Sequence, residues 1–442
     1  MQNSPHILCV NPWIHDFAAF DFWAKPLGLL FLCGILRDQN INISFIDCLD
    51  RFHPKEPHKP KILWDGRGPF RKTKIPHLKG LENIEKQFYR YGIKPQWFKE
   101  DIKQIKKPDI VFVTSLMTYW ASGVKETIEE IKKIYPNVPV VLGGIYASLC
   151  YEHAKKYSMA DLVVRGHGEK HLNKIIKDFT GFGLNQKKTI NSFKTNNFNA
   201  LDLQNKIAYA PLLTSRGCVF SCDYCASSYL EPKFIQKPAN LVFKEIEFWH
   251  TKYKIKNFAF YDDALLINAK KHAFVLFEKI INSKINAFFH TPNALHIKKI
   301  SEKASLLMFK AGFKTIRLGL ETTDFSNNQI NKCTKNEFFN AVKNLKKAGF
   351  KKEQLGAYLL CGLPNQNIEN LEKSMRFVYK TGIKPILAYY SPIPQTKMWD
   401  LAVKHSRFDI KLDPVFTNNS LFPCVDSKAY QKRISQLKNL SF

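Results

Sequence analysis

Three cysteines lie close together in one short segment, at Cys218, Cys222 and Cys225. Their C-x3-C-x2-C spacing places three thiolates on a single loop, close enough to bind one inorganic centre. A structural zinc ion needs four closed ligands, and an iron–sulfur cluster that only transfers electrons usually has four thiolates. Three thiolates instead leave one iron of a [4Fe–4S] cluster open to a substrate or cosubstrate. A zinc site completed by a distant fourth Cys or His is the alternative.

The residues around these cysteines resemble the signature of the radical S-adenosylmethionine (SAM) enzymes. The segment reads RGCVFSCDYC from Arg216 to Cys225, with Tyr224 directly before the last cysteine. The resemblance implies a [4Fe–4S] cluster on Cys218, Cys222 and Cys225, whose open iron binds the amino and carboxylate groups of SAM. In such enzymes the reduced cluster cleaves SAM to a 5′-deoxyadenosyl radical, so the cofactor carries the chemistry and the protein positions it.

Strand and helix patterns alternate through residues 207–400, the region that must position this loop. Six such repeats suit an open, partial (β/α)6 barrel of the TIM type, whose chemistry is found at the carboxyl ends of the strands. The resemblance implies the same architecture. The expected strands are Leu212–Ser215, Asn257–Tyr261, Ala287–Thr291, Thr315–Leu320, Gly356–Leu360 and Pro385–Tyr390.

Polar motifs end the second and third of these strands, where the resemblance implies contacts to SAM. Asp263 is expected to accept a hydrogen bond from the methionine ammonium group, while Asp262 could equally cap the next helix. Asn293 is a candidate for polar contacts to SAM, and Tyr224 is expected beside the cofactor.

Two later motifs complete the expected SAM site. Glu321 ends the fourth strand and is expected to bind the ribose or the amino group of SAM. Arg317 is expected either as a partner of the SAM carboxylate or as a salt-bridge partner within the barrel. Backbone atoms at Gly362 are expected to contact the adenine. No residue is identified as catalytic.

The first part of the chain also alternates strands with helices, which predicts a parallel α/β sheet of Rossmann-like, flavodoxin-like type. Ligands of such sheets bind beyond the carboxyl ends of the strands. The expected strands are His6–Val10, Ile41–Ile46, Asp109–Thr114, Val138–Leu142 and Asp161–Val164.

An α/β domain in this position resembles that of the cobalamin (B12)-binding subgroup of radical SAM enzymes. The resemblance implies cobalamin as a further cofactor, with Ser115, Gly143 and Gly144 near its nucleotide tail. The D-x-H-x-x-G motif that supplies a histidine to cobalt in many cobalamin proteins is absent, since His15-Asp16 has the reverse order. An α/β domain that no longer binds corrin is the alternative.

Five segments follow from these patterns. Residues 1–180 form the cobalamin-binding-like domain, interrupted at 51–107 by a basic insertion with interleaved aromatic residues. A linker rich in Asn, Lys and Thr is expected at 181–206, the radical SAM barrel at 207–400 and a C-terminal tail at 401–442. The insertion is expected to pack its aromatic side chains over the ligand edge of its domain, although such a segment can also bind single-stranded nucleic acid.

The 442-residue chain has 67 Lys and Arg against 38 Asp and Glu, a formal net charge of +29. The excess is spread along the chain without long blocks of like charge, so a nucleic-acid partner is not expected. No secretory signal and no apolar stretch long enough to span a bilayer is visible, and we expect a cytoplasmic protein with reduced thiols.

The patterns together predict a radical SAM enzyme that performs methyl transfer or rearrangement on an unidentified small-molecule substrate, with an external electron donor such as flavodoxin or ferredoxin. The net charge and the insertion motivate one alternative, a radical enzyme that modifies tRNA. A zinc-binding scaffold without catalytic activity is the alternative from another class of function.

Overall fold

The structure is a computed structural model that describes residues 4–186, 189, 192–195, 198–326, 332–425 and 428–439. The chain divides into two compact units. Unit 1 comprises Met1–Ala208 with Asp413–Val415, and unit 2 comprises Tyr209–Leu412 with Phe416–Phe442. Among the described residues, no helix is both long and apolar enough to cross a membrane.

Five parallel strands form the main sheet of unit 1, in the order β3-β1-β6-β7-β8. This is the 2-1-3-4-5 strand order of flavodoxin-like folds. In these folds the order of the strands reverses between the first and third strands, and ligands bind at that point. The predicted fold class is therefore confirmed for this unit. The strands are β1 (His6–Asn11), β3 (Asn42–Asp47), β6 (Ile110–Val113), β7 (Val140–Leu142) and β8 (Leu162–Val163).

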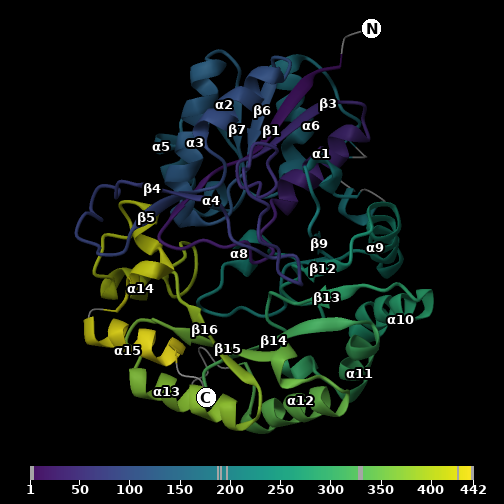
Figure 1. Ribbon diagram of the computed structural model, residues 1–442, viewed down its shortest axis with the longest axis vertical. Coiled ribbons are helices and arrows are strands. Elements are labelled where there is room, and N and C mark those ends of the chain that lie inside the picture. Colours follow the sequence, from purple (N-terminus) through teal and green to yellow (C-terminus); the bar gives the residue numbers. More distant parts are fainter. Residues whose placement is uncertain are drawn as a thin grey trace. The chain divides into compact units, whose positions relative to one another are not determined.

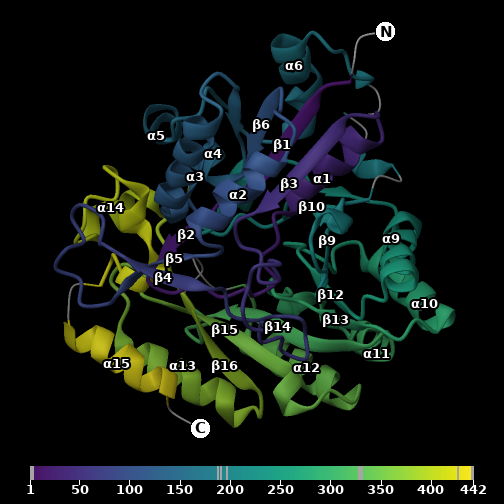
Figure 2. The same ribbon diagram turned by 45° about the horizontal axis from the view of Figure 1, so that its top comes forward.

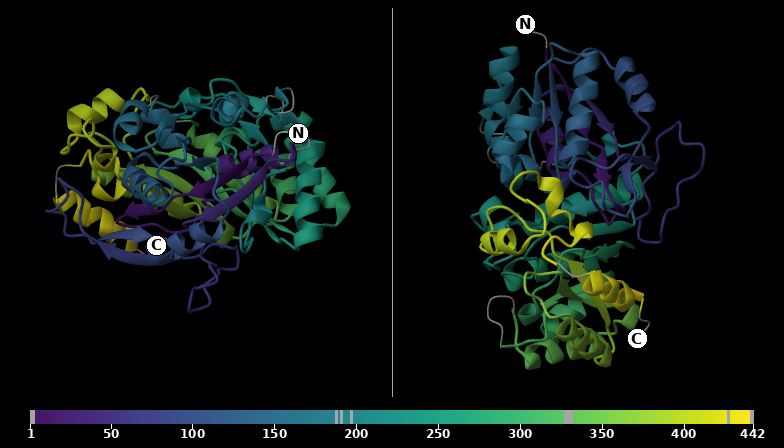
Figure 3. Two further views of the ribbon diagram at one scale, coloured as in Figure 1. Left: turned by 90° about the horizontal axis from the view of Figure 1, so that it is seen from above. Right: turned by 90° about the vertical axis from the view of Figure 1, so that its left-hand side faces the viewer.

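Helices cover both faces of this sheet, as Figure 1 and the right-hand view of Figure 3 show. Side chains of α2 and α3 enter the main core beside β1, β6 and β7, whereas α1 and α6 pack together on the other side. The helices are α1 (Leu27–Arg37), α2 (Pro95–Gln104), α3 (Ala121–Ile134), α4 (Ile145–Leu149), α5 (Tyr151–Tyr157) and α6 (Gly168–Thr180).

The basic insertion at 51–107 forms elements of its own. Its strands β4 (Lys72–Ile75) and β5 (Phe88–Tyr91) make an antiparallel sheet with β2 (Ile14–Asp16), in the order β2-β5-β4. Because β2 directly follows β1, this small sheet begins at the carboxyl edge of the main sheet. Phe70 and Tyr91 are buried in a small core within it.

Six parallel strands form the main sheet of unit 2 and follow one another in chain order. Helices α9 to α13 alternate with them along the chain, so the predicted partial (β/α)6 barrel is confirmed (Figure 2). The strands are β9 (Ala210–Leu212), β12 (Asn257–Phe260), β13 (Phe288–His290), β14 (Phe313–Glu321), β15 (Leu355–Cys361) and β16 (Lys384–Tyr389).

Further elements of unit 2 surround this sheet. A short antiparallel ribbon joins β10 (Ser215–Arg216) to β11 (Ile235–Gln236). The helices are α8 (Ser227–Leu230), α9 (Ala239–Tyr253), α10 (Ala273–Ser283), α11 (Glu302–Lys310), α12 (Lys335–Lys347), α13 (Ile368–Lys380), α14 (Trp399–His405) and α15 (Lys428–Asn439).

Two segments in which we expected neither helices nor strands pack against other parts of the chain. In the segment expected as a linker, Leu184, Ala200 and Leu201 are buried, and the backbone N–H of Ala200 donates to the Leu30 carbonyl of α1 at 3.0 Å. Residues 187, 188, 190, 191, 196 and 197 of that segment lie outside the described residues. The segment expected as a tail contains α15, which packs against α13.

Candidate functional site

The loop that carries the three cysteines begins at β10, just after the first strand of the barrel. Gly217 has a φ of +78°, and a side chain there would lie 2.9 Å from the Lys233 carbonyl oxygen, so the ribbon requires glycine at this position. Further along the loop, the Cys225 N–H donates to the Cys222 carbonyl at 3.0 Å. The ribbon and this turn fix both ends of the cysteine loop.

The three thiols are partly buried and lie within electrostatic reach of one another. Burial is the main cause that raises the pKa of Cys218 and of Cys225, and a negative charge on Cys222 raises both further. Among the described residues, no group of three or more His, Cys, Asp or Glu side chains is arranged to hold a metal ion. Three thiols on one loop are the donor set of a [4Fe–4S] cluster with one open iron.

A partly buried lysine that the sequence did not indicate lies beside this loop. Lys332 Nζ is 2.9 Å from Glu321 Oε1 and 5.4 Å from the centre of the Tyr224 ring. Burial lowers the pKa of Lys332, but the charges of Glu321 and of the nearby cysteines outweigh burial and raise the pKa overall. The lysine therefore stays positively charged, next to the thiols.

Tyr224 and Glu321, two of the predicted SAM-binding residues, are brought together with this lysine. The Tyr224 hydroxyl is buried beside Glu321. Burial, followed by the charge of Glu321 and a hydrogen bond to it, raises the pKa of Tyr224, so the hydroxyl stays protonated. Glu321 is 6% exposed and has a φ of +66°, a left-handed conformation that is uncommon for a residue other than glycine. A strained backbone conformation at a strand end, beside a charged lysine and a buried tyrosine, is typical of a ligand-binding site.

The two aspartates after β12 have different roles. Asp262 is buried and accepts hydrogen bonds from the Thr214 hydroxyl at 2.7 Å and the Ser215 hydroxyl at 2.6 Å, so it ties the start of the cysteine loop to β12. It does not cap a helix with these contacts. Asp263 is exposed and accepts a hydrogen bond from the Ser227 hydroxyl at 2.5 Å, directly after the cysteine loop.

Residues after β13 add a histidine to the site. Asn293 is exposed, and its side-chain amide donates to the Tyr261 carbonyl at 2.7 Å. His296 Nε2 lies 3.5 Å from Cys218 Sγ, and the His296 ring packs 4.2 Å from that of Phe220. Burial, followed by the charge of Lys332, lowers the pKa of His296 to about 4. In the sequence, the only indication of His296 is its position a few residues after the expected strand Ala287–Thr291.

Two predicted SAM-binding residues are not brought into this group. The Arg317 guanidinium donates to the Ile316 carbonyl at 3.0 Å and to the Gln354 carbonyl at 3.3 Å. Gln354 directly precedes the amino end of β15. Gly362 has a φ of +88°, and its N–H already donates to the Gln366 side chain at 2.7 Å. Arg317 therefore faces backbone carbonyls away from the thiols, and the Gly362 N–H is satisfied within the protein.

The predicted cobalamin-binding residues lie at the carboxyl ends of β6 and β7. The buried Ser115 hydroxyl donates to the Gly143 carbonyl at 2.7 Å, and its backbone carbonyl accepts from the Ile145 N–H at 2.7 Å. Gly144 has φ +98° and ψ −163°, a conformation that is essentially confined to glycine. Ser115 and Gly144 thus hold together the loops that follow β6 and β7, rather than presenting polar groups to a ligand.

Apolar side chains are exposed at this edge, next to a glycine with open space beside it. A side chain added at Gly143 would meet no atom within 4 Å. The neighbouring apolar side chains of Met117 and Ile145 are 46% and 37% exposed. Apolar side chains exposed beside an open glycine, at the strand ends where such sheets bind ligands, suit a corrin ring.

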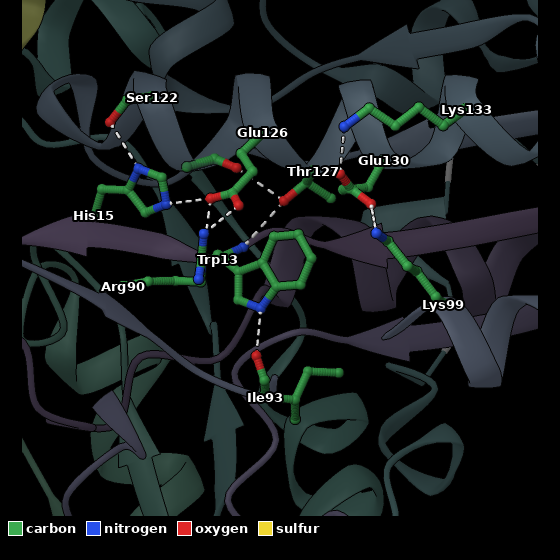
Figure 4. A network of polar contacts seen from close by, with 11 residues as sticks. Trp13, His15, Arg90, Ile93, Lys99, Ser122, Glu126, Thr127, Glu130 and Lys133 are labelled. Atoms are coloured by element: carbon green, nitrogen blue, oxygen red, sulfur yellow. Dashed lines mark hydrogen bonds and ion pairs between the residues drawn. The ribbon is translucent and has the colours of Figure 1, made fainter. Parts of the chain in front are cut away.

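His15, the histidine closest to a cobalt-binding motif in the sequence, is fully engaged by neighbouring side chains (Figure 4). Its Nε2 lies 2.6 Å from Glu126 Oε2, and its Nδ1 contacts the Ser122 hydroxyl at 3.2 Å. Glu126 also pairs with Arg90, whose Nε lies 2.9 Å from Glu126 Oε2. Both ring nitrogens of His15 therefore have partners on α3, and the ring is not available to a metal in this arrangement.

Two protein families match the two units. Residues 212–378 match the radical SAM superfamily, and residues 82–176 match the B12 binding domain. The first range begins in β9 and contains the cysteine loop, Glu321 and Lys332. The second contains Ser115, Gly143 and Gly144.

Curated relatives are about one quarter identical to this chain over the aligned residues. A protein named as an uncharacterised methyltransferase, from Pyrococcus horikoshii, is 26% identical over 345 residues, which cover 70% of this chain and 73% of that protein. Anaerobic magnesium-protoporphyrin IX monomethyl ester cyclases from Rubrivivax gelatinosus and Cereibacter sphaeroides are 25% and 24% identical, over 61% and 68% of this chain. The match spans 54% of the length of each cyclase.

The solved structures of the radical SAM methyltransferase TsrM from Kitasatospora setae have the same fold. One holds tryptophan and a SAM analogue, and aligns with a TM-score of 0.66 at 15% identity. The other holds cobalamin and a [4Fe–4S] cluster, and aligns with a TM-score of 0.67 at 14% identity. Both alignments cover 91% of this chain, and they cover 76% and 79% of TsrM.

Proposed function

This chain is a radical SAM enzyme with an N-terminal B12-binding domain, and we propose that it transfers a methyl group to a small-molecule substrate with the help of cobalamin. Its cofactors are a [4Fe–4S] cluster, SAM and cobalamin. When bound, the reduced cluster supplies the electron that cleaves SAM, and cobalamin supplies a cobalt atom that carries a methyl group. In this proposal Cys218, Cys222 and Cys225 hold the cluster.

The side chains beside the cysteine loop would bind and orient SAM. Lys332 offers the positive charge that the SAM carboxylate needs, which is one of the two roles that the sequence left open for Arg317. Asp263 and Glu321 are the carboxylates that face the same region, and each can accept from an ammonium or a ribose hydroxyl. The protonated Tyr224 hydroxyl lies beside the Glu321 carboxylate and would help to hold it in place.

The carboxyl edge of the unit 1 sheet would hold cobalamin without a protein histidine from the His15 loop. His15 is engaged by Glu126 and Ser122, so the face of the corrin would rest on apolar side chains and backbone near Gly143.

One observation carries this proposal: the same chain contains a three-thiol loop at a barrel mouth and an open, glycine-bounded edge of a flavodoxin-like sheet. The methyltransferase relative and the TsrM fold support methyl transfer over other chemistry. An acidic electron donor such as flavodoxin or ferredoxin would suit the basic chain. A cytoplasmic location belongs to the proposal as well, since all ten cysteines are free thiols.

Product analysis after anaerobic reconstitution tests the proposal. Enzyme with cluster, cobalamin and SAM is reduced with dithionite in the presence of candidate substrates. The formation of 5′-deoxyadenosine together with S-adenosylhomocysteine supports methyl transfer, because one SAM supplies the radical and a second supplies the methyl group. Formation of 5′-deoxyadenosine alone, with every substrate, would favour a cyclase or rearrangement reaction instead.

A triple Cys→Ala variant at positions 218, 222 and 225 is the control. It is expected to lose iron, sulfide and the brown chromophore, and with them both products. Zinc in place of iron after anaerobic purification of the native chain would contradict the proposal.

A further inference from the structure

The basic insertion of unit 1 presents apolar side chains on a rigid turn that faces solvent. Trp64 is 62% exposed and Ile62 is 41% exposed. In the adjoining segment, Phe22 is 60% exposed. Isolated exposed apolar residues are ordinary, but three in adjoining segments, one of them a tryptophan, indicate a contact surface. We call Phe22, Lys59, Lys61, Ile62 and Trp64 the insertion tip.

Backbone hydrogen bonds make the turn at the tip rigid. The Gly66 N–H donates to the Leu63 carbonyl at 2.9 Å, and the Leu63 N–H donates to the Arg67 carbonyl at 2.8 Å. Gly66 has a φ of +86°, which the turn requires. Trp64 lies at the bend of this turn, so its exposed position is built into the backbone.

A buried arginine anchors the tip from below. The Arg51 guanidinium is 5% exposed and donates to the Gly66 carbonyl at 2.7 Å and to the Lys61 carbonyl at 3.2 Å. Its Nε also lies 3.2 Å from Asp21 Oδ2, which ties in the segment that carries Phe22. These three contacts of one rigid, buried guanidinium hold the two chain segments in one place.

The charges around the tip are of one sign. The stretch PHKPKILW from Pro57 to Trp64 contains His58 and two exposed lysines, and it contains no acidic residue. The acidic residues next to the tip in the sequence are paired, because Asp21 binds Arg51, Asp65 binds Arg67 and Glu56 binds Arg71. The tip is therefore apolar at its turn and positive at its flank.

From this combination we propose that the insertion tip docks on the surface of an anionic lipid membrane. Tryptophan favours the interface between water and lipid, and aliphatic side chains such as Ile62 enter the acyl boundary. Lysines beside them attract anionic headgroups within a Debye length of the surface. A single-stranded nucleic acid suits the tip less well, since Ile62 offers no ring for a base to stack on. The enzyme would then work at a membrane surface, and this inference does not depend on the proposed reaction.

Vesicle sedimentation with the full, cofactor-loaded chain tests the proposal. Vesicles of phosphatidylglycerol and phosphatidylcholine, and vesicles of phosphatidylcholine alone, are compared at about 0.1 M salt. The native chain is expected to bind the anionic vesicles at least about tenfold more strongly. Both I62A/W64A and K59E/K61E are expected to weaken that binding about tenfold or more.

Matched controls lie on α6 of the same unit. K174E/K177E changes the net charge by the same amount, and F179A removes an aromatic side chain that is 40% exposed. Both are expected to bind vesicles as the native chain does. All variants are expected to keep their cofactors and their thermal stability, because the altered side chains are exposed.

Three results would overturn the proposal. The native chain could fail to bind anionic vesicles, or the α6 controls could lose as much binding as the tip variants. Alternatively, the chain could bind tRNA but not vesicles, with binding lost in I62A/W64A, which would make the tip a nucleic-acid surface. None of these results bears on the formation of 5′-deoxyadenosine, so the proposed function is tested separately.

Discussion

Lys332 and Arg317 show how the surroundings of a cation decide its role. Both lie near the end of the fourth barrel strand in the sequence, yet Arg317 is held by two backbone carbonyls and Lys332 by a buried carboxylate beside the thiols. A buried charge is costly unless it is paired, so the Lys332–Glu321 pair marks a place where charge is needed. The carboxylate of SAM is the anion that the proposed function brings there.

We therefore predict that K332M weakens the binding of SAM to the cluster-loaded enzyme about tenfold or more, because a charge-assisted hydrogen bond contributes roughly 1.5–3 kcal/mol. Equilibrium dialysis with labelled SAM measures this without any turnover. K335M, which removes an exposed lysine at the start of α12, should leave SAM affinity unchanged. If K332M and the native enzyme bound SAM with equal affinity, Lys332 would only neutralise the charge of Glu321 and would not bind SAM.

The site residues that the sequence indicated are those whose signal is local. The spacing of the three cysteines predicted a shared inorganic centre, and the resemblance of the same loop added Tyr224. Lys332 reaches the thiols from a separate loop after β14, and no local pattern marks such a contact. The sequence left two roles open for Arg317, because a strand presents side chains to both faces and position in the chain does not resolve which one faces a ligand.

A titrating group in unit 1 gives a prediction for acid stability. Burial raises the pKa of Glu126, but the hydrogen bonds from His15 and Arg90 outweigh it and lower the pKa to about 2, below the ordinary 4.5. A carboxylate with a lowered pKa stabilises the fold above about pH 4.5, and this stabilisation is lost as the pH falls toward 2. The urea midpoint of the native chain should therefore fall across this range.

E126Q provides the comparison for this prediction. It should be less stable at pH 7 by about 1–3 kcal/mol, because His15 and Arg90 lose a charged partner. Its urea midpoint should also change less between pH 4.5 and pH 2. A native midpoint that follows the same pH curve as E126Q would rule out the Glu126 contribution.

At the scale of elements, periodicity predicted both sheets and most of their helices. Expected strands such as Asn257–Tyr261 and Gly356–Leu360 coincide with β12 and β15 to within a residue or two, because buried parallel strands are short apolar runs between turns. The small β2-β5-β4 sheet was not predicted. Its strand β4 reads KTKI, mostly exposed, and it is held by pairing with β5 rather than by an apolar pattern.

The turn between β7 and α4 depends on one glycine. Gly144 adopts φ +98° and ψ −163°, and a Cβ there would lie 2.3 Å from the Ser115 carbonyl oxygen. We predict that G144A lowers the stability of unit 1 by roughly 1–3 kcal/mol and weakens cobalamin binding by at least about tenfold, since the β6 and β7 loops would separate. Thermal unfolding and the absorbance of cobalamin retained on a desalting column measure the two effects.

G183A is a suitable control for G144A, because a side chain at Gly183 would meet no atom within 4 Å. It should leave cobalamin binding and unit 1 stability unchanged. Native cobalamin retention in G144A would mean that the corrin does not depend on the packing of these two loops.

At the scale of the whole molecule, each unit supplies its own cofactor residues. The cysteine loop, Glu321 and Lys332 all belong to unit 2, whereas Ser115, Gly143 and Gly144 all belong to unit 1. Each unit also has its own sheet, so the proposed residues of the two sets are positioned by different elements. This separation was predictable from the two runs of alternating patterns. The packing of the segments at 181–206 and 401–442 was not, since it depends on distant contacts such as that of Ala200 with Leu30.

Because the two residue sets are separate, we predict that the two metal cofactors are lost independently. The triple Cys→Ala variant should contain no iron or sulfide and still retain cobalamin at the native level. G144A should lose cobalamin and still retain about four irons per chain after reconstitution. Metal analysis for iron and cobalt on the same samples measures both outcomes. The contrary outcome is loss of cobalt in the cysteine variant while circular dichroism shows that unit 1 is still folded. That result would mean that the cluster and its loop contribute to cobalamin binding, so that the two cofactors do not bind independently.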